Sequence, residues 1–400
     1  MNKFFSSLVI IATVFGLSFA AIEKPVQANV NGRKIIVFNQ ALNEKEKDEL
    51  IARAGGTKLK NLDLIGAKAV WLPNRAATEK LKANSNVIRI DDDVLVETLD
   101  IKEEIRGVKK MGIKPQPPET LPWGIDRVDA ELVWPTIRGA GIKVGVIDTG
   151  IDLSHPDLVL NIKGGYNAIN PLNSPNDNNG HGTHVAGIMG AVDNTIGVIG
   201  VGPQINLYAI KVLGASGSGY LSDVIEGLDW AIVNGMNVVN MSLGTSDDIL
   251  SFREAVQRVN AAGIVQVAAA GNSGGSVIYP AAYPEVIAVS ATNNTNTIAS
   301  WSSRGPEVDL AAPGVSIYST YKGQTYKTLS GTSMASPHVA GTAGLVLNTP
   351  VGSYDLDADD IWDPIEVQNK LQDKVVDLGS PGFDSLYGWG LVNAFNAVQP

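Results

Sequence analysis

Five short, mainly apolar runs in the middle of the chain constrain its fold more than any other feature. They cover residues 142–147, 207–212, 238–243, 264–270 and 286–289. Runs of this length and composition are typical of strands that are buried on both faces of a sheet. Helical patterns separate some of them, such as residues 221–233 and 249–262. This alternation predicts an α/β fold with a doubly wound, mostly parallel sheet flanked by helices.

Polar side chains follow three of these predicted strands. Asp148 comes directly after the first run, Ser242 lies at the end of the third, and Asn272 follows the fourth. Because the carboxyl ends of parallel strands meet at one edge of a sheet, we expect these side chains to lie close together. That edge is where open α/β folds place their sites.

Residues 31–100 are predicted to form a separate, small α+β unit. Strands are expected at 34–38, 67–72 and 87–90, and helices at 43–54 and 76–83. This order favours a compact, ferredoxin-like sheet with helices on one face. Residues 101–118 are charged and then rich in proline, which predicts a linker before a second domain at 119–400.

The first twenty residues are typical of a secretory signal peptide. Lys3 supplies a positive charge, residues 4–19 are apolar, and small residues precede a cleavage point after Ala20. A second candidate cleavage point follows Ala28. The alternative is a membrane anchor, but the apolar stretch is shorter than the ~20 residues that a span requires. We therefore expect an extracellular protein without stable membrane insertion.

Composition excludes several classes of site and partner. The chain has no cysteine, which rules out thiol catalysis, cysteine metal sites and disulfide bonds. Its formal net charge is −10, which argues against nucleic acid as a partner. A cysteine-free exported protein must be stabilised by something other than disulfide bonds.

Three motifs carry a carboxylate, an imidazole and a hydroxyl in the order Asp, His, Ser. They are Val-Ile-Asp-Thr-Gly around Asp148, His-Gly-Thr-His from His181, and Gly-Thr-Ser-Met-Ala-Ser around Ser333. A serine is a poor nucleophile unless a base takes its proton, and a carboxylate can hold the imidazole in the tautomer that does so. Residues 334–348 are predicted to continue as a helix, whose N-terminal amides favour negative charge beside Ser333.

Each motif taken alone has a structural explanation. Ser333 could simply cap a helix, and Asp148 could stabilise a turn. His181 and His184 could bind zinc, but the glutamate of the metalloprotease arrangement is missing. His184 and His338 are expected to be buried structural residues, and His155 a loop residue. All three motifs in this order favour acyl transfer over these alternatives.

On these motifs, residues 119–400 resemble the subtilisin family of serine endopeptidases. Residues 31–100 resemble, less specifically, the inhibitory propeptide of that family. The resemblance implies that Asn272 and the Ser333 backbone N–H stabilise the oxyanion. It also implies a monomeric enzyme that acts on proteins or peptides, is blocked by its own propeptide, and matures by self-processing within residues 101–118.

The resemblance also assigns a substrate groove. Two backbone edges that would grip an extended peptide are Ser216, Gly217, Ser218 and Gly219 on one side and Ser242, Leu243 and Gly244 on the other. Ala269, Ala270 and Gly271 would form the second wall of the first specificity pocket, with Ile278 near its floor. Because no acid is evident there, we expect a preference for large apolar or aromatic side chains before the cut bond.

Structural calcium is the expected substitute for disulfide bonds. By resemblance, its ligands are Asp157, Val192, Asn194, Ile196 and Val198, with Glu119 as a further ligand. Their oxygen donors suit calcium. A second candidate loop has Asp355, Asp357 and Asp359 with Glu366 at the twelfth position, but Asp360 replaces the glycine needed at the sixth. Residues 363–366 read better as a capped helix start.

Two functional alternatives remain. The chain could be a catalytically silent homologue that only binds peptides, or a protein whose only substrate is itself. The presence of all four catalytic residues argues against the first alternative. Turnover of an unrelated protein would exclude the second.

Overall fold

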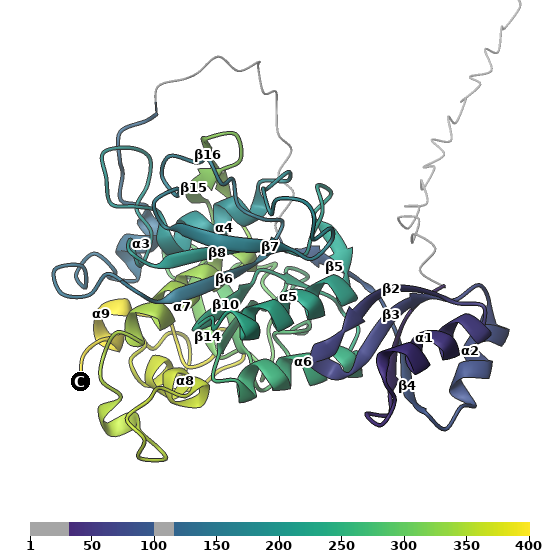
Figure 1. Cartoon of the computed structure of the whole chain (residues 1–400). Helices are drawn as coiled ribbons and strands as arrows, with labels where there is room; N and C mark the ends of the chain where they lie inside the picture. The colour runs from purple at the N-terminus through teal and green to yellow at the C-terminus, as the bar shows by residue number, and fades with distance from the viewer. Residues whose placement is uncertain (1–31, 100–115) are drawn as a thin grey trace, which may run out of the picture. The chain divides into compact units, whose positions relative to one another are not determined.

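A seven-stranded sheet forms the centre of the fold, and all neighbouring strands in it are parallel (Figure 1). The strand order is β14-β13-β12-β10-β6-β8-β7. The strands are β6 (Lys143–Asp148), β7 (Ile162–Asn167), β8 (Asn206–Lys211), β10 (Val238–Met241), β12 (Val265–Ala269), β13 (Ile287–Thr292) and β14 (Leu310–Pro313). The predicted fold class is therefore confirmed, and each predicted run contributes a strand. The strands β7 and β14 were not predicted.

The computed structural model describes residues 32–99 and 116–400. The predicted signal peptide and most of the predicted linker lie outside the described residues. Gly32–Pro400 form one compact unit. Within the part of the chain that is described, no helix is both long enough and apolar enough to cross a bilayer.

Helices cover both faces of the central sheet, and the side chains of β6 show why. Val144 and Val146 belong to the apolar cluster that contains residues of α4 (His181–Gly190) and α7 (Thr332–Val346). Ile147 belongs to the opposite cluster, with residues of α5 (Leu221–Val233) and α6 (Leu250–Ala261). Successive side chains of a strand point to opposite faces, so an apolar run needs a cover on each.

Smaller elements complete the larger part of the chain. They are α3 (Trp123–Arg127), the hairpin β15 (Ile317–Tyr321) and β16 (Thr325–Leu329), η3 (Gly352–Tyr354), α8 (Pro364–Asp373) and α9 (Ala394–Ala397). The predicted helix start is confirmed at α8, where Asp363 and Glu366 form a capping box around Pro364. The hairpin was not predicted.

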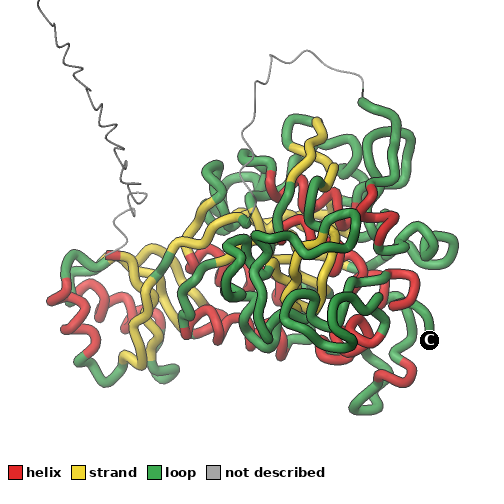
Figure 2. Tube along the Cα trace, turned by 180° about the vertical axis from the view of Figure 1, so that it is seen from behind, coloured by secondary structure: helices red, strands yellow, loops and turns green. Residues whose placement is uncertain are grey.

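The N-terminal part is a four-stranded antiparallel sheet with the order β2-β3-β1-β4. Its elements are β1 (Arg33–Phe38), α1 (Glu44–Arg53), β2 (Thr57–Leu62), η2 (Asp63–Ile65), β3 (Ala67–Trp71), α2 (Arg75–Lys82) and β4 (Val87–Asp92). This is the predicted ferredoxin-like arrangement. The extra strand is β2, whose sequence Thr-Lys-Leu-Lys-Asn-Leu is polar and mostly exposed and so gave no strand signal. Figure 2 shows the strands of both sheets in yellow.

The two faces of the N-terminal sheet pack against different helices. Ile36 and Phe38 form a cluster with residues of α1 and α2. Ile35 and Val37 belong to the cluster that contains residues of α5 and α6. The N-terminal sheet therefore lies between its own helices and two helices of the larger part.

A short strand links the N-terminal sheet to the carboxyl edge of the central sheet. It is β5 (Leu95–Thr98), which pairs antiparallel with β9 (Ser218–Tyr220) and with β11 (Leu243–Gly244). The resulting order is β11-β5-β9.

Candidate active site

The predicted carboxylate and imidazole meet in a buried pair. Asp148 ends β6 and His181 begins α4. Nδ1 of His181 lies 2.8 Å from Oδ1 and 2.9 Å from Oδ2 of Asp148. Since a carboxylate only accepts, Nδ1 is the donor, and a neutral His181 keeps its lone pair on Nε2. Gly182 permits the close approach, because a Cβ there would lie 2.2 Å from the carbonyl oxygen of Gly150.

Ser333 lies at the start of α7 and is fully buried. Its hydroxyl donates to the carbonyl oxygen of Ser242 at 3.2 Å, and the Ser242 hydroxyl donates back to the Ser333 carbonyl at 2.9 Å. The hydroxyl thus bonds the residue that directly follows β10. Reaction requires this hydroxyl to pass its proton to the imidazole instead. Catalytic hydrogen bonds often form only when substrate is bound for reaction.

Two N–H donors converge on one carbonyl oxygen beside Ser333. Oδ1 of Asn272 accepts from the backbone N–H and the hydroxyl of Thr332, at 2.9 and 2.8 Å. This fixes the amide so that Nδ2 donates to the carbonyl oxygen of Leu99 at 2.6 Å. The backbone N–H of Ser333 donates to the same oxygen at 3.4 Å. Two donors aimed at one oxygen form the geometry that stabilises a tetrahedral oxyanion.

The two predicted peptide-binding edges lie on either side of β5. Glu97 pairs with Ser218, and Thr98 pairs with Leu243. The Thr98 backbone N–H also donates to the carbonyl of Gly217 at 2.9 Å. An extended segment is therefore held by main-chain bonds from both edges, a mode of recognition that tolerates many sequences. The sequence did not predict that this chain's own β5 occupies the groove.

The predicted walls of the specificity pocket meet at Ile278. A Cβ on Gly244 would lie 2.6 Å from Cδ1 of Ile278, and a Cβ on Gly271 would lie 3.4 Å from its Cγ1. Gly271 also faces Ser303, whose hydroxyl would lie 2.7 Å from that Cβ. Ala269 and Ala270 are fully buried. Sequence reasoning missed Ser303, which lies 32 positions along the chain from Gly271 and carries no motif of its own.

The other three histidines are buried. Nε2 of His184 bonds the carbonyl oxygens of Ile317 and Lys327 in the β15–β16 hairpin, at 3.1 and 3.0 Å. Burial lowers the pKa of His184 to about 3 and that of His338 to about 4. These neutral rings suit structural positions, and the two hairpin carbonyls hold the His184 ring in place. His155 is a loop residue, as expected, and its ring is buried against Tyr326, with ring centres 5.2 Å apart.

The predicted calcium ligands gather around one loop. Asp157 accepts from the Asn194 amide at 2.8 Å and from the Val198 N–H at 2.9 Å. Glu119 accepts from the backbone N–H of Asn194 at 2.7 Å. Two backbone N–H groups of the loop belong to the same network. That of Val192 donates to the Asp157 carbonyl oxygen at 3.0 Å, and that of Ile196 donates to Oδ1 of Asn194 at 2.7 Å.

The charges of this loop fit a hard cation. Burial, with a smaller contribution from the charge on Glu119, raises the pKa of Asp157 to about 6. Burial is also the main cause that raises the pKa of Glu119 above its usual value. Each carboxylate would be stabilised by a cation between them, and amide and carbonyl oxygens nearby complete a donor set that suits Ca²⁺.

The rival acidic loop is organised by its own backbone. Within the described residues, Asp355, Asp357 and Asp359 have carboxylate oxygens within 4.8 Å of one another. However, Asp355 accepts the N–H groups of residues 358, 359 and 360. Glu366, the twelfth-position ligand of the alternative, accepts from the N–H groups of Leu356 and Asp363. Both carboxylates thus serve local turns and the start of α8.

Carboxylates from the N-terminal part cap two helices of the larger part. Asp91 accepts from the N–H and hydroxyl of Ser251 in α6, the first at 3.1 Å. Asp93 accepts from the N–H and hydroxyl of Ser222 in α5, at 2.8 and 2.9 Å. The residue that precedes α6 is Ile249, which has no polar side chain to cap the helix itself. These helix starts therefore obtain a side-chain cap from the other part of the chain.

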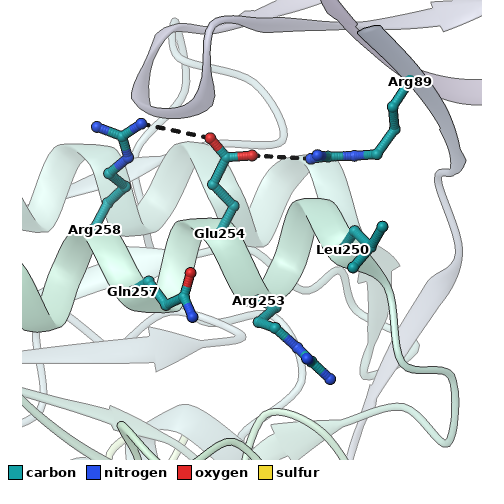
Figure 3. Close-up of a pocket in the computed structure, with 6 residues that line it drawn as sticks. All are labelled: Arg89, Leu250, Arg253, Glu254, Gln257 and Arg258. Carbon is teal, nitrogen blue, oxygen red and sulfur yellow. Dashed lines mark hydrogen bonds and ion pairs between the residues drawn. The ribbon is translucent and has the colours of Figure 1, made fainter.

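An ion pair adds to this contact. Figure 3 shows Glu254 of α6 between Arg258 of the same helix and Arg89 from β4. Nη2 of Arg89 lies 2.9 Å from Glu254, while Arg258 lies 3.5 Å away. Arg89 also contacts Asp91 at 2.7 Å, so the ion pair and the helix cap form one network.

Comparisons with known proteins agree with the motifs. The model of the subtilase family matches residues 139–390. Subtilisin Savinase of Lederbergia lenta is 48% identical over 283 residues, which are 70% of this chain and 100% of that protein. An alkaline protease of Alkalihalobacillus alcalophilus is 47% identical over 70% of each chain. Subtilisin J of Geobacillus stearothermophilus is 37% identical over 406 residues, 98% of each chain, and so spans the N-terminal part as well.

Proposed function

The chain belongs to the subtilase family and is a serine endopeptidase, and on that premise we propose that Asp148, His181 and Ser333 hydrolyse peptide bonds through an acyl-enzyme. The observation that carries this proposal is the buried Asp148–His181 pair beside two donors that converge on one carbonyl oxygen. We further propose that the enzyme is secreted as a precursor, acts as a monomer, and has broad specificity.

In the proposed acylation step each of these groups has one role. His181 Nε2 takes the proton of the Ser333 hydroxyl as the oxygen attacks the substrate carbonyl. Asp148 keeps the proton on Nδ1 and stabilises the imidazolium that forms. The Asn272 amide and the Ser333 N–H bind the negatively charged oxygen. His181 then passes its proton to the leaving amine. Water gives a proton to His181 as it attacks the acyl carbon, and the Ser333 oxygen leaves with that proton, which frees the product acid.

Preference for a large apolar residue before the cut bond follows from the pocket. Its walls are residues 242–244 and 269–271, with Ile278 between two of their glycines. The rest of the substrate would be held mainly by backbone bonds to Gly217, Ser218 and Leu243, as β5 is here. Main-chain recognition explains a broad substrate range.

We assign the N-terminal part, residues 31–100, as an inhibitory propeptide. Support comes from β5, which fills the groove, and from the caps that Asp91 and Asp93 provide to α6 and α5. Caps that arrive from the propeptide would favour formation of both helices while the catalytic domain folds.

Asp93→Ala should speed release of the propeptide after processing. The change removes a helix cap and leaves Arg33, which lies 2.9 Å from Asp93, without this partner. We expect the lag before activity toward a chromogenic peptide to shorten about tenfold. Asp92→Ala is the matched control, because Asp92 pairs with Lys34 inside the propeptide. An unchanged lag in Asp93→Ala would contradict the assignment.

We assign calcium as a structural cofactor of the 192–198 loop. Asp157, Asn194 and Glu119 would supply side-chain oxygens, and Val192, Ile196 and Val198 would supply carbonyls. The ion would neutralise two carboxylates whose pKa values are raised by burial. It would tie the segment after residue 116 to the loop, since Glu119 and Thr120 already bond the carbonyls of Thr195 and Gly197.

Removal of calcium should lower the Tm of the catalytic domain. A chelator is expected to lower it by about 10 °C. A shift of this size corresponds to the stabilisation lost when an ion present at a concentration well above its Kd is removed. Thermal unfolding of the Ser333→Ala protein, which cannot digest itself, measures this shift. Asp157→Asn should abolish the response to calcium, whereas Asp355→Asn should retain it. The reverse pattern would place the ion in the acidic loop instead.

Turnover of an unrelated unfolded protein by the matured enzyme tests the proposed function. Multiple turnovers, with cuts mainly after large apolar residues, are the expected result. A silent homologue would give no cuts, and a protein that processes only itself would cleave its propeptide and nothing else.

A further inference from the structure

The carbonyl of Leu99 lies where a reacting carbonyl would lie. Its oxygen accepts from Nδ2 of Asn272 at 2.6 Å and from the Ser333 backbone N–H at 3.4 Å. Asn272 cannot turn its oxygen to this position without losing both bonds from Thr332. The donors that would bind an oxyanion thus already bind a carbonyl of this chain.

The residues before Leu99 lie as an extended substrate would. Leu95, Val96 and Glu97 pair with Tyr220, Gly219 and Ser218 in order. Thr98 pairs with Leu243 on the opposite edge. Val96 is fully buried among apolar side chains of the larger part, so this register is fixed by a side chain as well as by main-chain bonds.

We propose that the first self-processing cut of the precursor is the peptide bond that follows Leu99. This inference rests on the proposed function. The Ser333 oxygen would bond to the Leu99 carbonyl carbon, and the bond to the next nitrogen would break as His181 gives that nitrogen its proton. Water would then cleave the ester, which leaves a carboxylate on Leu99 and restores the Ser333 hydroxyl. One water is consumed in all.

This bond lies just before the segment at 101–118 in which the sequence predicts processing. The catalytic part would therefore keep a new N-terminal extension after the first cut, and any cut within 101–118 would follow as trimming. The chain beyond the extension is held independently, because Pro118 and Thr120 bridge to Ile196 and Val198. Release of the propeptide would leave these bridges in place.

N-terminal sequencing of the large fragment at early times of maturation, with the intact mass of the small fragment, tests the inference. The large fragment should begin Asp-Ile-Lys, from Asp100, and the small one should end at Leu99. Leu99→Asp should slow this cut about 100-fold, since the proposed specificity favours a large apolar side chain before the cut bond. Met111→Asp, which removes an apolar residue from the segment 101–118, should leave the first cut unchanged.

A first cut within 101–118, or its loss in Met111→Asp, would overturn the inference. A second test does not depend on the folding of Leu99→Asp. A peptide of residues 94–105 is given to the matured wild-type enzyme, which should cut it after Leu99. A cut elsewhere in the peptide would count against the inference. Failure here is distinct from failure of the proposed function. An enzyme that digests unrelated protein but cuts its precursor elsewhere retains the function, whereas one that does neither loses both.

Discussion

Ser333→Ala should abolish hydrolysis of proteins and peptides while the fold remains intact. The serine supplies the only bond that links enzyme to acyl group in the proposed mechanism, so no other residue can replace it. In subtilisin itself, a member of the same family, loss of the serine lowers kcat by about 10⁶-fold. We expect a loss of the same order in steady-state assays with a chromogenic peptide.

A matched control lies on the same helix. Thr342 of α7 donates only to the carbonyl of His338 in the described contacts, far along the helix from Ser333. Thr342→Ala removes a buried hydroxyl but should leave kcat within about twofold, with a modest fall in Tm. Substantial residual activity in Ser333→Ala would show that another group carries the reaction.

Asn272→Leu should lower kcat with little change in KM. The side chains have similar shape, but leucine cannot donate to the oxyanion. Loss of the corresponding donor in subtilisin costs about 10²- to 10³-fold in kcat. KM should stay within about threefold, because the extended substrate is held by the edges at residues 216–219 and 242–244. A large rise in KM with kcat unchanged would make Asn272 a residue of ground-state binding instead.

Much of the central fold could be predicted because local pattern and global structure agree there. The run before Asp148 is mainly apolar, with Val144 and Val146 toward one cluster and Ile147 toward the other. Both faces are covered by helices, so it becomes β6. Parallel strands all end at the same edge of a sheet, which is why Asp148, Ser242 and Asn272 lie at one edge. The capped start of α8 is equally local, since Asp363 and Glu366 are three residues apart.

Other features could not be predicted because they depend on distant partners. β7 contains Gly164 and Gly165 and has neighbours on one side only, so its sequence lacks a strand pattern. The helix caps from Asp91 and Asp93 cross 160 and 129 positions of sequence. The position of the Leu99 carbonyl between Asn272 and Ser333 follows from the register of β5, which is set by two other strands.

The hydrogen-bond partner of the Ser333 hydroxyl is a further detail that the motifs do not specify. Sequence favours a bond to His181, whereas the structure bonds it to the carbonyl of Ser242. Three staggered positions are available to a serine side chain, and the sequence does not say which of them is occupied. The motif predicts which residues meet, and the local contacts decide which rotamer is occupied.

The role of Ser333 as the nucleophile can be tested by labelling the matured protein with a fluorophosphonate, followed by mass spectrometry of its peptides. We expect a single adduct on Ser333, which requires an activated hydroxyl beside oxyanion donors, and no adduct in Ser333→Ala. A folded, matured protein that gains no adduct, or gains it on another residue, would contradict the assignment of Ser333 as the nucleophile.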